Sequence, residues 1–114
     1  MSKEKEIHWE GSSREDLLKF PKNALKEAGF QLSKVQTGNE PDNWKPFDDV
    51  GIGVKEIRIR DTDGIYRVMY VAKFKEAIYV LHCFQKKKKT TTKRDKEITK
   101  TRYRGVINKK KQLK

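Results

Sequence analysis

Residues 54–84 read VKEIRIRDTDGIYRVMYVAKFKEAIYVLHCF, and this stretch decides the fold. Residues 54–60 alternate apolar and charged side chains, which is the two-residue period of a β-strand with one wet face. Residues 61–64 are a turn signal between two apolar runs, and residues 65–71 supply the partner strand. Residues 77–84 are almost continuously apolar, as expected of a central strand buried on both faces. The stretch therefore predicts a three-stranded antiparallel meander.

The chain before this stretch shows a helical pattern. Pro21 ends one short helix and suits the first turn of a second helix over about residues 21–36. The second helix has apolar residues at three- and four-residue spacing, namely Ala24, Leu25, Ala28, Leu32 and Val35. Short apolar stretches at residues 7–9 and 44–47 indicate edge strands. The two helices together predict an N-terminal helical hairpin.

A basic helix is expected after the meander. Residues 90–92 (TTT) offer a helix cap, and a thin apolar seam follows at Ile98, Tyr103 and Val106. The predicted fold class is α+β, with the helical hairpin packed on a twisted antiparallel sheet of three to five strands and the basic helix at the C-terminal end. We expect one domain over residues 1–107 and a basic, disordered tail over residues 108–114.

The charge of the chain is concentrated at one end. Residues 1–85 carry 14 Lys and Arg against 14 Asp and Glu, so they are neutral. Residues 86–114 carry 14 Lys and Arg against two acidic residues, and they hold the whole net charge of +12. A neutral body with a basic end is typical of a protein that binds a polyanion, such as RNA or the ribosome. The alternatives are a solvated tail without a partner, or contact with a membrane surface, which the lack of an apolar face disfavours.

Several classes of protein are disfavoured by what the sequence lacks. The single cysteine, Cys83, excludes a disulfide framework, and neither histidine has the spacing of a metal site. There is no phosphate-binding glycine loop and no Gly-x-Ser-x-Gly elbow, so we expect neither a metal nor a cofactor. No apolar run reaches membrane-spanning length, and residues 1–10 lack the apolar core of a secretory signal, so the expected location is the cytoplasm.

Cationic side chains in the middle of strands are the distinctive feature. Arg58 and Arg60 share one strand face, and Arg67 lies in the next strand, where a turn centred on residues 63–64 would bring Arg60 and Arg67 together. A charge in mid-strand costs free energy unless the face is open or the charge is paired. One interpretation is an ordinary wet face on which Glu56 neutralises Arg58. The other is a phosphate-binding hollow lined by guanidinium groups.

His82 is the one titratable side chain well placed for proton transfer near neutral pH. The alternative interpretation is a core histidine with satisfied hydrogen bonds. Cys83 points to the opposite side of a regular strand and is expected to be a small core residue. Phe84 is expected to be a packing residue that can stack on a base if it is exposed.

Three motifs in order carry a family resemblance. They are GxGVxEIR at residues 51–58, DGxYRVxY at 63–70 and VLHxFxKK at 80–87. Flanking residues that also fit are Phe20-Pro21, Gln36-x-Gly38, the stretch 41–46, Lys93-Arg94-Asp95-x-Glu97-Ile98 and Arg102-Tyr103-Arg104. On these residues the chain resembles the phage-derived, HigB-like branch of the RelE/ParE toxin superfamily, from about residue 6 to residue 106.

The resemblance implies the toxin of a two-gene toxin–antitoxin pair. Such toxins enter the ribosomal A site and cut mRNA without a metal, through attack of the RNA 2′-hydroxyl on the adjacent phosphate. Their antitoxin is often a helix-turn-helix protein. Relatives of the ParE type poison gyrase instead, so a toxin without nuclease activity stays as an alternative, as does an inactive prophage-derived RNA-binding protein.

The resemblance also implies roles for single residues. Arg67 matches a strand arginine that contacts the scissile phosphate, and Lys86 matches a second basic residue after the last strand. His82 is the candidate acid or base, Glu56 is a less favoured one, and Thr92 falls near the position of a tyrosine that some members carry. The candidate catalytic set is therefore Arg67, Lys86, His82 and Arg58. The candidate RNA-binding set is Arg60, Lys55, Lys87, Lys88, Lys89, Lys93 and Arg94.

Overall fold

The computed structural model describes residues 4–86 and 90–112. The predicted candidates Lys87, Lys88 and Lys89 lie outside the described residues. In chain order the elements are β1 (Glu6–Trp9), α1 (Ser13–Leu18), α2 (Lys22–Gln36), β2 (Trp44–Pro46), β3 (Val54–Asp61), β4 (Gly64–Val71), β5 (Ala77–Lys86) and α3 (Lys93–Gln112).

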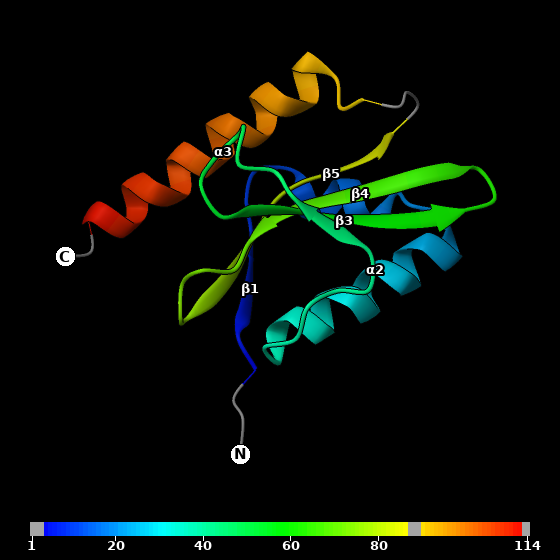
Figure 1. The fold of residues 1–114 in the computed structure, drawn as a ribbon, viewed down its shortest axis with the longest axis horizontal. Coiled ribbons are helices and arrows are strands. Elements are labelled where there is room, and N and C mark those ends of the chain that lie inside the picture. Colours follow the sequence, from blue (N-terminus) through cyan, green and yellow to red (C-terminus); the bar gives the residue numbers. More distant parts are fainter. Residues whose placement is uncertain (1–3, 87–89, 113–114) are drawn as a thin grey trace.

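The five strands form one mixed sheet in the order β1-β5-β4-β3-β2. The predicted meander is confirmed, since β3, β4 and β5 pair antiparallel in sequence order, and β2 extends the sheet antiparallel to β3. The expectation of a purely antiparallel sheet is wrong, because β1 pairs parallel to β5. In the sequence, two helices lie between β1 and the other strands (Figure 1). The direction of β1 is therefore set by tertiary packing and not by a hairpin turn.

Helices cover both faces of the sheet. Figure 1 shows α2 on one side of the sheet and α3 on the other. On the first face α1 packs on β5 and α2 packs on β3, so the expected helical hairpin is not the arrangement found. The physical reason is length, because α1 has six residues and α2 has 15, and a one-and-a-half-turn helix offers little surface for an antiparallel helix partner.

A separate hydrophobic core fills each side of the sheet. Between the sheet and α1 and α2, the largest fully buried residues include Tyr70, Leu32, Ile57 and Ile78. Between the sheet and α3 lie the buried residues Val50, Val54, Met69, Val71, Ala77, Tyr79, Leu81 and Val106. Strand β5 contributes to both cores, which confirms the prediction that it is buried on both faces.

A β-bulge in β5 decides which side chains face α3. Met69 pairs with His82, but the next residue of β4, Tyr70, pairs with Val80, so Leu81 has no partner in the ladder. As a result Leu81 packs in the α3 core and the adjacent His82 also bonds α3, while Cys83 lies in the opposite core. Burial raises the pKa of the Cys83 thiol.

Helix α3 begins after an N-cap threonine, Thr92, and continues beyond the expected domain end. Thr92 Oγ1 accepts a hydrogen bond from the backbone N–H of Asp95 at 3.2 Å, and the Asp95 carboxylate accepts one from Thr92 Oγ1 at 2.7 Å. The tail was expected from residue 108, but α3 continues to Gln112. Lys109 pairs with Glu10 at 3.0 Å and Lys110 pairs with Glu76, so these cations hold the end of the helix to the sheet layer. Within the described residues, no helix is long and apolar enough to cross a membrane.

Gly51 lies directly against a side chain of α3. A Cβ atom at Gly51 would lie 2.5 Å from the ring of Tyr103, which is a ring of α3. The Tyr103 hydroxyl donates to the Ile52 carbonyl at 2.8 Å and accepts from Lys73 Nζ at 3.1 Å. The ring is therefore fixed at both ends and has little room to move away from an added methyl group.

We predict that Gly51→Ala destabilises the protein by about 1–3 kcal/mol, which is typical of overpacking. Thermal unfolding measures this change. Gly29→Ala is the matched control, because a Cβ at Gly29 in α2 meets no atom within 4 Å, and it should raise the melting temperature. Combining Gly51→Ala with Tyr103→Ala should cost less than the sum of the two single changes. Strict additivity would show that the Tyr103 ring does not cause the effect.

Candidate functional site

A fully buried carboxylate lies in the middle of β3, on the face that α3 covers. Glu56 is 0% exposed, and its Oε1 accepts a hydrogen bond from the guanidinium of Arg67 on β4. Its Oε2 accepts a longer hydrogen bond, of 3.4 Å, from Thr91 Oγ1 in the segment before α3. Arg67 is also buried, at 3% exposure, so the two residues form an ion pair inside the protein.

Further cations surround the same carboxylate. Arg58 Nε lies 3.5 Å from Glu56 Oε1, and Lys45 Nζ of β2 lies 3.8 Å from it. The side chains of Arg58 and Lys45 are about one-third exposed, at 34% and 38%. One carboxylate thus lies under one buried and two partly exposed cations.

Lys86 adds a fourth cation at the end of β5. It pairs with Ile65, two residues from Arg67 on the same face of β4. Burial lowers the pKa of Lys86, and the positive charge of Arg67 lowers it further. Lys45, Glu56, Arg58, Arg67 and Lys86 are together called the Glu56 cluster below. Arg67 and Lys86 therefore lie on one side of the sheet, as cleavage at a single phosphate requires.

The Glu56 cluster differs from the predicted arrangement in two ways. The turn after β3 joins Asp61 to Gly64, so Arg58 lies opposite Arg67 while Arg60 lies opposite Ile65. The prediction that Arg60 lies opposite Arg67 is therefore wrong, because the observed strand register is shifted by two residues. The predicted contact between Glu56 and Arg58 is found. The predicted wet face is not found, because Glu56 is fully buried, and the closest partner of Glu56 is Arg67.

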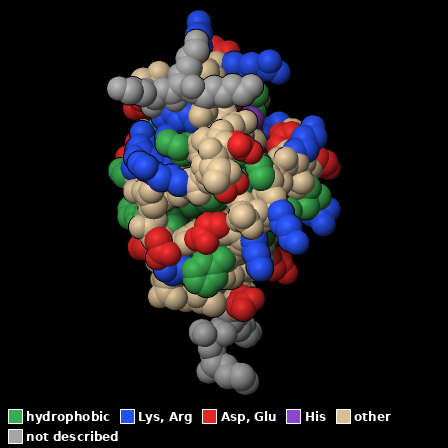
Figure 2. Space-filling view, turned by 90° about the vertical axis from the view of Figure 1, so that its right-hand side faces the viewer, with side chains coloured by type: hydrophobic (Ala, Val, Ile, Leu, Met, Phe, Trp, Pro, Cys, Tyr) green, Lys and Arg blue, Asp and Glu red, His purple; other side chains and the backbone are tan. Residues whose placement is uncertain are grey.

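The predicted RNA-binding residues outside the cluster are scattered. Lys55 lies on the opposite face of β3 and pairs with Glu40 at 3.0 Å. Arg60 is exposed near the end of β3, and Lys93 and Arg94 are exposed in the first turn of α3. Figure 2 looks onto the end of the molecule with the β3–β4 turn, where Lys and Arg side chains flank a strip that also carries Asp and Glu. In the part of the chain that the structure describes, no group of His, Cys, Asp and Glu is arranged to hold a metal ion.

His82 forms a second polar site on the same face. Its Nε2 lies 2.8 Å from Oδ1 of Asp95, and its ring stacks on Phe84 with 4.7 Å between the ring centroids. Burial lowers the pKa of His82, and the Asp95 carboxylate opposes that shift. Because the imidazole is then neutral near pH 7, Nε2 donates its proton to Asp95 and Nδ1 is left as an acceptor. Nδ1 is buried and has no hydrogen-bond partner among the described residues.

The two polar sites are separate. His82 and Lys86 are four residues apart in β5, which is about 13 Å of extended strand. The ring of Phe84 lies between them and is the cross-strand neighbour of Arg67. The structure thus brings Arg58, Arg67 and Lys86 together but places the fourth predicted catalytic residue, His82, beside Asp95.

Sequence reasoning missed the residues that hold these sites in place. Lys45 was not considered, and Thr91 was read only as part of a helix cap. The sequence predicts Glu56 as a partner of Arg58 or as a less favoured base, but not as the buried partner of Arg67. No local pattern joins His82 to Asp95, because 13 residues separate them.

We predict that Glu56→Gln destabilises the protein by about 3–5 kcal/mol, because it leaves the buried Arg67 charge without its counter-ion. Urea unfolding measures the change. The matched control is Glu40→Gln, which removes an exposed pair with Lys55 and should cost less than about 1 kcal/mol. Equal losses in the two variants would contradict the view that the Glu56 cluster depends on a buried charge pair.

We also predict that stability falls below pH 6.5, the ordinary pKa of histidine. The folded protein holds His82 with a lowered pKa, so the unfolded chain binds the proton more readily and acid favours unfolding. The contribution is complete above pH 6.5 and is lost as the pH falls toward the folded pKa, by at most about 1.4 kcal/mol per pH unit. Urea unfolding between pH 7.5 and 5 should show this slope, and His82→Gln should flatten it. An unchanged slope in that variant would assign the effect to other groups.

Comparison with known proteins places these two sites in a family. The family described as phage-derived protein Gp49-like (DUF891) matches residues 15–104, which include all of β2 to β5 and the first part of α3. No curated protein matches the chain. The matched region contains every described member of the Glu56 cluster together with His82 and Asp95. The chain belongs to the phage-derived Gp49-like family, which is a family of RelE/ParE-like toxins.

Proposed function

We propose that this protein is the toxin of a toxin–antitoxin pair, of the HigB-like branch, and that it cleaves mRNA on the ribosome in the cytoplasm. The observation that supports the proposal is the Glu56 cluster, in which four cations on three adjacent strands and the end of β5 surround one carboxylate. An excess of positive charge at one place on a sheet suits a phosphodiester, which carries one negative charge and gains more during cleavage.

The exposed and buried cations have different roles in this proposal. Arg58, Lys45 and Lys86 are the partly exposed members, and they bind the phosphate oxygens. Arg67 lies beneath them on Glu56, so direct contact with the phosphate requires that the covering side chains move. In this proposal Arg67 is a positioning residue that fixes Glu56 and supplies positive charge from below.

The chemistry proceeds through amino-acid side chains. The RNA 2′-oxygen attacks the adjacent phosphorus, the bond from phosphorus to the 5′-oxygen breaks, and a 2′,3′-cyclic phosphate and a 5′-hydroxyl result. Glu56 is the Brønsted base of the cluster, and it accepts the 2′-hydroxyl proton when the side chains that cover it move aside and the long hydrogen bond from Thr91 opens. Lys86 protonates the leaving oxygen, since its lowered pKa makes its ammonium group a better acid.

The ribosome supplies the remaining part of the rate. Holding the mRNA in an attack geometry replaces part of the acid–base catalysis that a free enzyme needs. The basic segment from Lys86 onward binds ribosomal RNA in a salt-dependent manner. An antitoxin, expected to be a helix-turn-helix protein, neutralises the toxin. His82 lies about 13 Å along β5 from Lys86, with Phe84 between them, and it bonds Asp95, so we do not place it in the chemical step.

We predict that Arg58→Gln and Lys86→Gln each lower mRNA cleavage by about 10²-fold, the usual cost of losing one group that stabilises transition-state charge. The measurement maps 5′-hydroxyl mRNA ends after induction of the toxin in growing cells. Both residues are partly exposed, so the variants keep the fold. Arg14→Gln, on the exposed side of α1, is the control for loss of one positive charge and should cleave like the wild type.

Two results would contradict the proposal. Undiminished cleavage in the Arg58→Gln and Lys86→Gln variants at equal protein levels would remove the Glu56 cluster from the reaction. Intact mRNA with growth arrest and DNA damage in the wild type would instead indicate a gyrase-poisoning toxin.

A further inference from the structure

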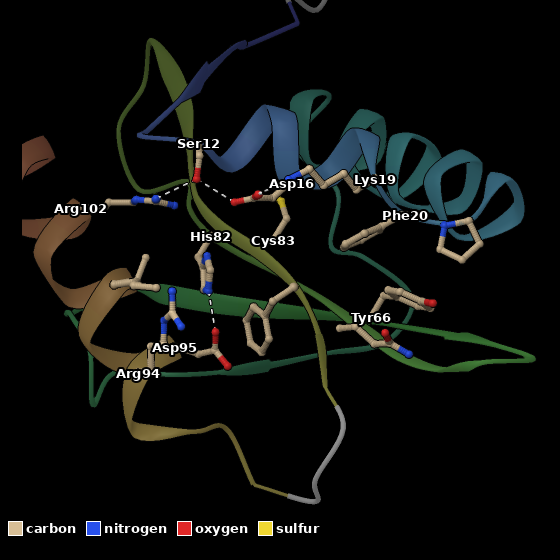
Figure 3. A pocket seen from close by; sticks show the side chains of 14 residues that line it. Ser12, Asp16, Lys19, Phe20, Tyr66, His82, Cys83, Arg94, Asp95 and Arg102 are labelled. Carbon is tan, nitrogen blue, oxygen red and sulfur yellow. Dashed lines mark hydrogen bonds and ion pairs between the residues drawn. The ribbon is translucent and has the colours of Figure 1, made fainter.

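A groove lies at the open edge of β5. Strand β1 pairs only with residues Ala77 to Val80, so the C-terminal half of β5 has no neighbouring strand on that side among the described residues. A cavity of about 680 Å³ occupies this edge, between α1 and the first turns of α3. Figure 3 shows that the labelled side chains of this cavity come from both helices and from the sheet between them. This cavity is called the edge groove below.

Aromatic rings line the edge groove on both faces of the sheet. Phe84 and His82 are stacked with an angle of 19° between their planes, on the α3 side. Phe20 and Tyr66 pack with 4.8 Å between centroids on the other side (Figure 3). Phe84 is partly exposed, so one part of its ring is open to a flat partner. Flat apolar surfaces of this kind bind nucleobases by stacking.

The edge groove also carries positive charge that its own carboxylates do not neutralise. The lining carries three cations, Lys19, Arg94 and Arg102, against two carboxylates, Asp16 and Asp95, which leaves a net charge of +1. Asp16 accepts a hydrogen bond from Ser12 Oγ at 2.7 Å, and Asp95 accepts one from His82 at 2.8 Å. Arg102 donates to the Leu81 carbonyl at 2.9 Å and to Ser12 Oγ at 3.1 Å. Neither Arg94 nor Arg102 is paired with a carboxylate within residues 4–86 and 90–112. The groove therefore suits a ligand that carries negative charge as well as a flat ring.

An unpartnered buried acceptor is the independent sign of a ligand. His82 is 6% exposed and lines the edge groove, and its Nδ1 has no hydrogen-bond partner in the described part of the chain. Asp95 holds the proton on Nε2, so Nδ1 presents a lone pair. A ribose hydroxyl or a base amino group can donate to that lone pair, whereas a phosphate without a proton cannot.

We propose that the edge groove binds a nucleotide of the RNA substrate next to the cleaved linkage, with its base on Phe84 and its phosphate on Arg94 and Arg102. The inference rests on the proposed function, since Phe84 lies between His82 and Lys86 on β5 and is the cross-strand neighbour of Arg67 in the Glu56 cluster. The pocket would thus select substrates long enough to fill both the Glu56 cluster and the edge groove.

The two histidines of the chain offer a direct test. His82 lies in the edge groove, and His8 lies on β1 with its ring against Tyr79, outside the groove lining. A trinucleotide that carries a 2′-O-methyl group only at the attacking nucleotide cannot be cleaved, and its other ribose hydroxyls stay free to donate to His82 Nδ1. Titrating it into the full-length protein should shift the imidazole NMR signals of His82 and leave those of His8 in place. Unmoved His82 signals at a trinucleotide concentration that saturates binding would overturn the inference.

Variants separate the edge groove from the Glu56 cluster. Phe84→Leu and Arg94→Gln should each weaken binding of a 2′-O-methyl hexanucleotide by about 10-fold, the value of one stacked base or one lost charge contact. Arg14→Gln, an exposed arginine of α1 outside both the groove lining and the basic C-terminal segment, is the matched control and should bind like the wild type. Thermal unfolding confirms that Phe84→Leu keeps the fold, and Arg94→Gln tests the groove without touching the core.

Comparing the variants shows whether a negative result contradicts the edge-groove inference or the proposed function. If Phe84→Leu and Arg94→Gln bind the hexanucleotide like the wild type while Arg58→Gln binds it weakly, the edge groove is not an RNA subsite but the proposed function stands. If Arg58→Gln also binds like the wild type, the proposed function fails with it. If the groove instead receives a peptide strand on the open edge of β5, the hexanucleotide leaves His82 unaffected, and that result too overturns the inference.

Discussion

The buried carboxylate of Glu56 is the constraint on which the rest of the site depends. An ion withdrawn from water loses several kcal/mol of solvation free energy, so it is stable only with a counter-ion and further hydrogen bonds. Arg67 supplies the counter-ion, Thr91 supplies a hydrogen bond, and Arg58 and Lys45 lie within 4 Å. These partners come from three strands and the segment before α3, so a single negative charge fixes their relative positions. A cluster of cations that repel one another is held together in this way.

The sequence was sufficient for the elements whose side chains show a clear period. Alternation predicted β3 and β4, the apolar run predicted a central β5, and three- and four-residue spacing predicted α2. Side-chain period says nothing about which strand is the neighbour, which is why the parallel pairing of β1 was missed. It also says little about a six-residue helix such as α1, whose partner is chosen by the sheet beneath it.

The part of the site that follows from the solvation cost of charged side chains could be predicted from the sequence. The cost of a cation in mid-strand correctly pointed to the face that carries Arg58 and Arg67. The exact pairing across the strands was not predictable, because the turn signal at residues 61–64 allows registers that differ by two residues. Nor was the burial of Arg67, because its buried partner, Glu56, lies on another strand and 11 residues away in the sequence. Distance in sequence likewise hid the bond between His82 and Asp95.

The extra residue at Leu81 has a consequence for how the chain tolerates change. On a strand, parity alone decides which face a side chain sees, and the unpaired Leu81 resets that parity for everything after it. If β5 were regular and Leu81 were paired, the imidazole would turn into the opposite core and the thiol of Cys83 would face Asp95 instead. Deleting Leu81 itself would join Val80 and His82 in a regular strand, still opposite Tyr70 and Met69, so the imidazole would stay on the α3 side. The extra residue is therefore a place where β5 can lose one codon, with the loss of one apolar side chain from the α3 core, without exchanging the chemistry offered to α3.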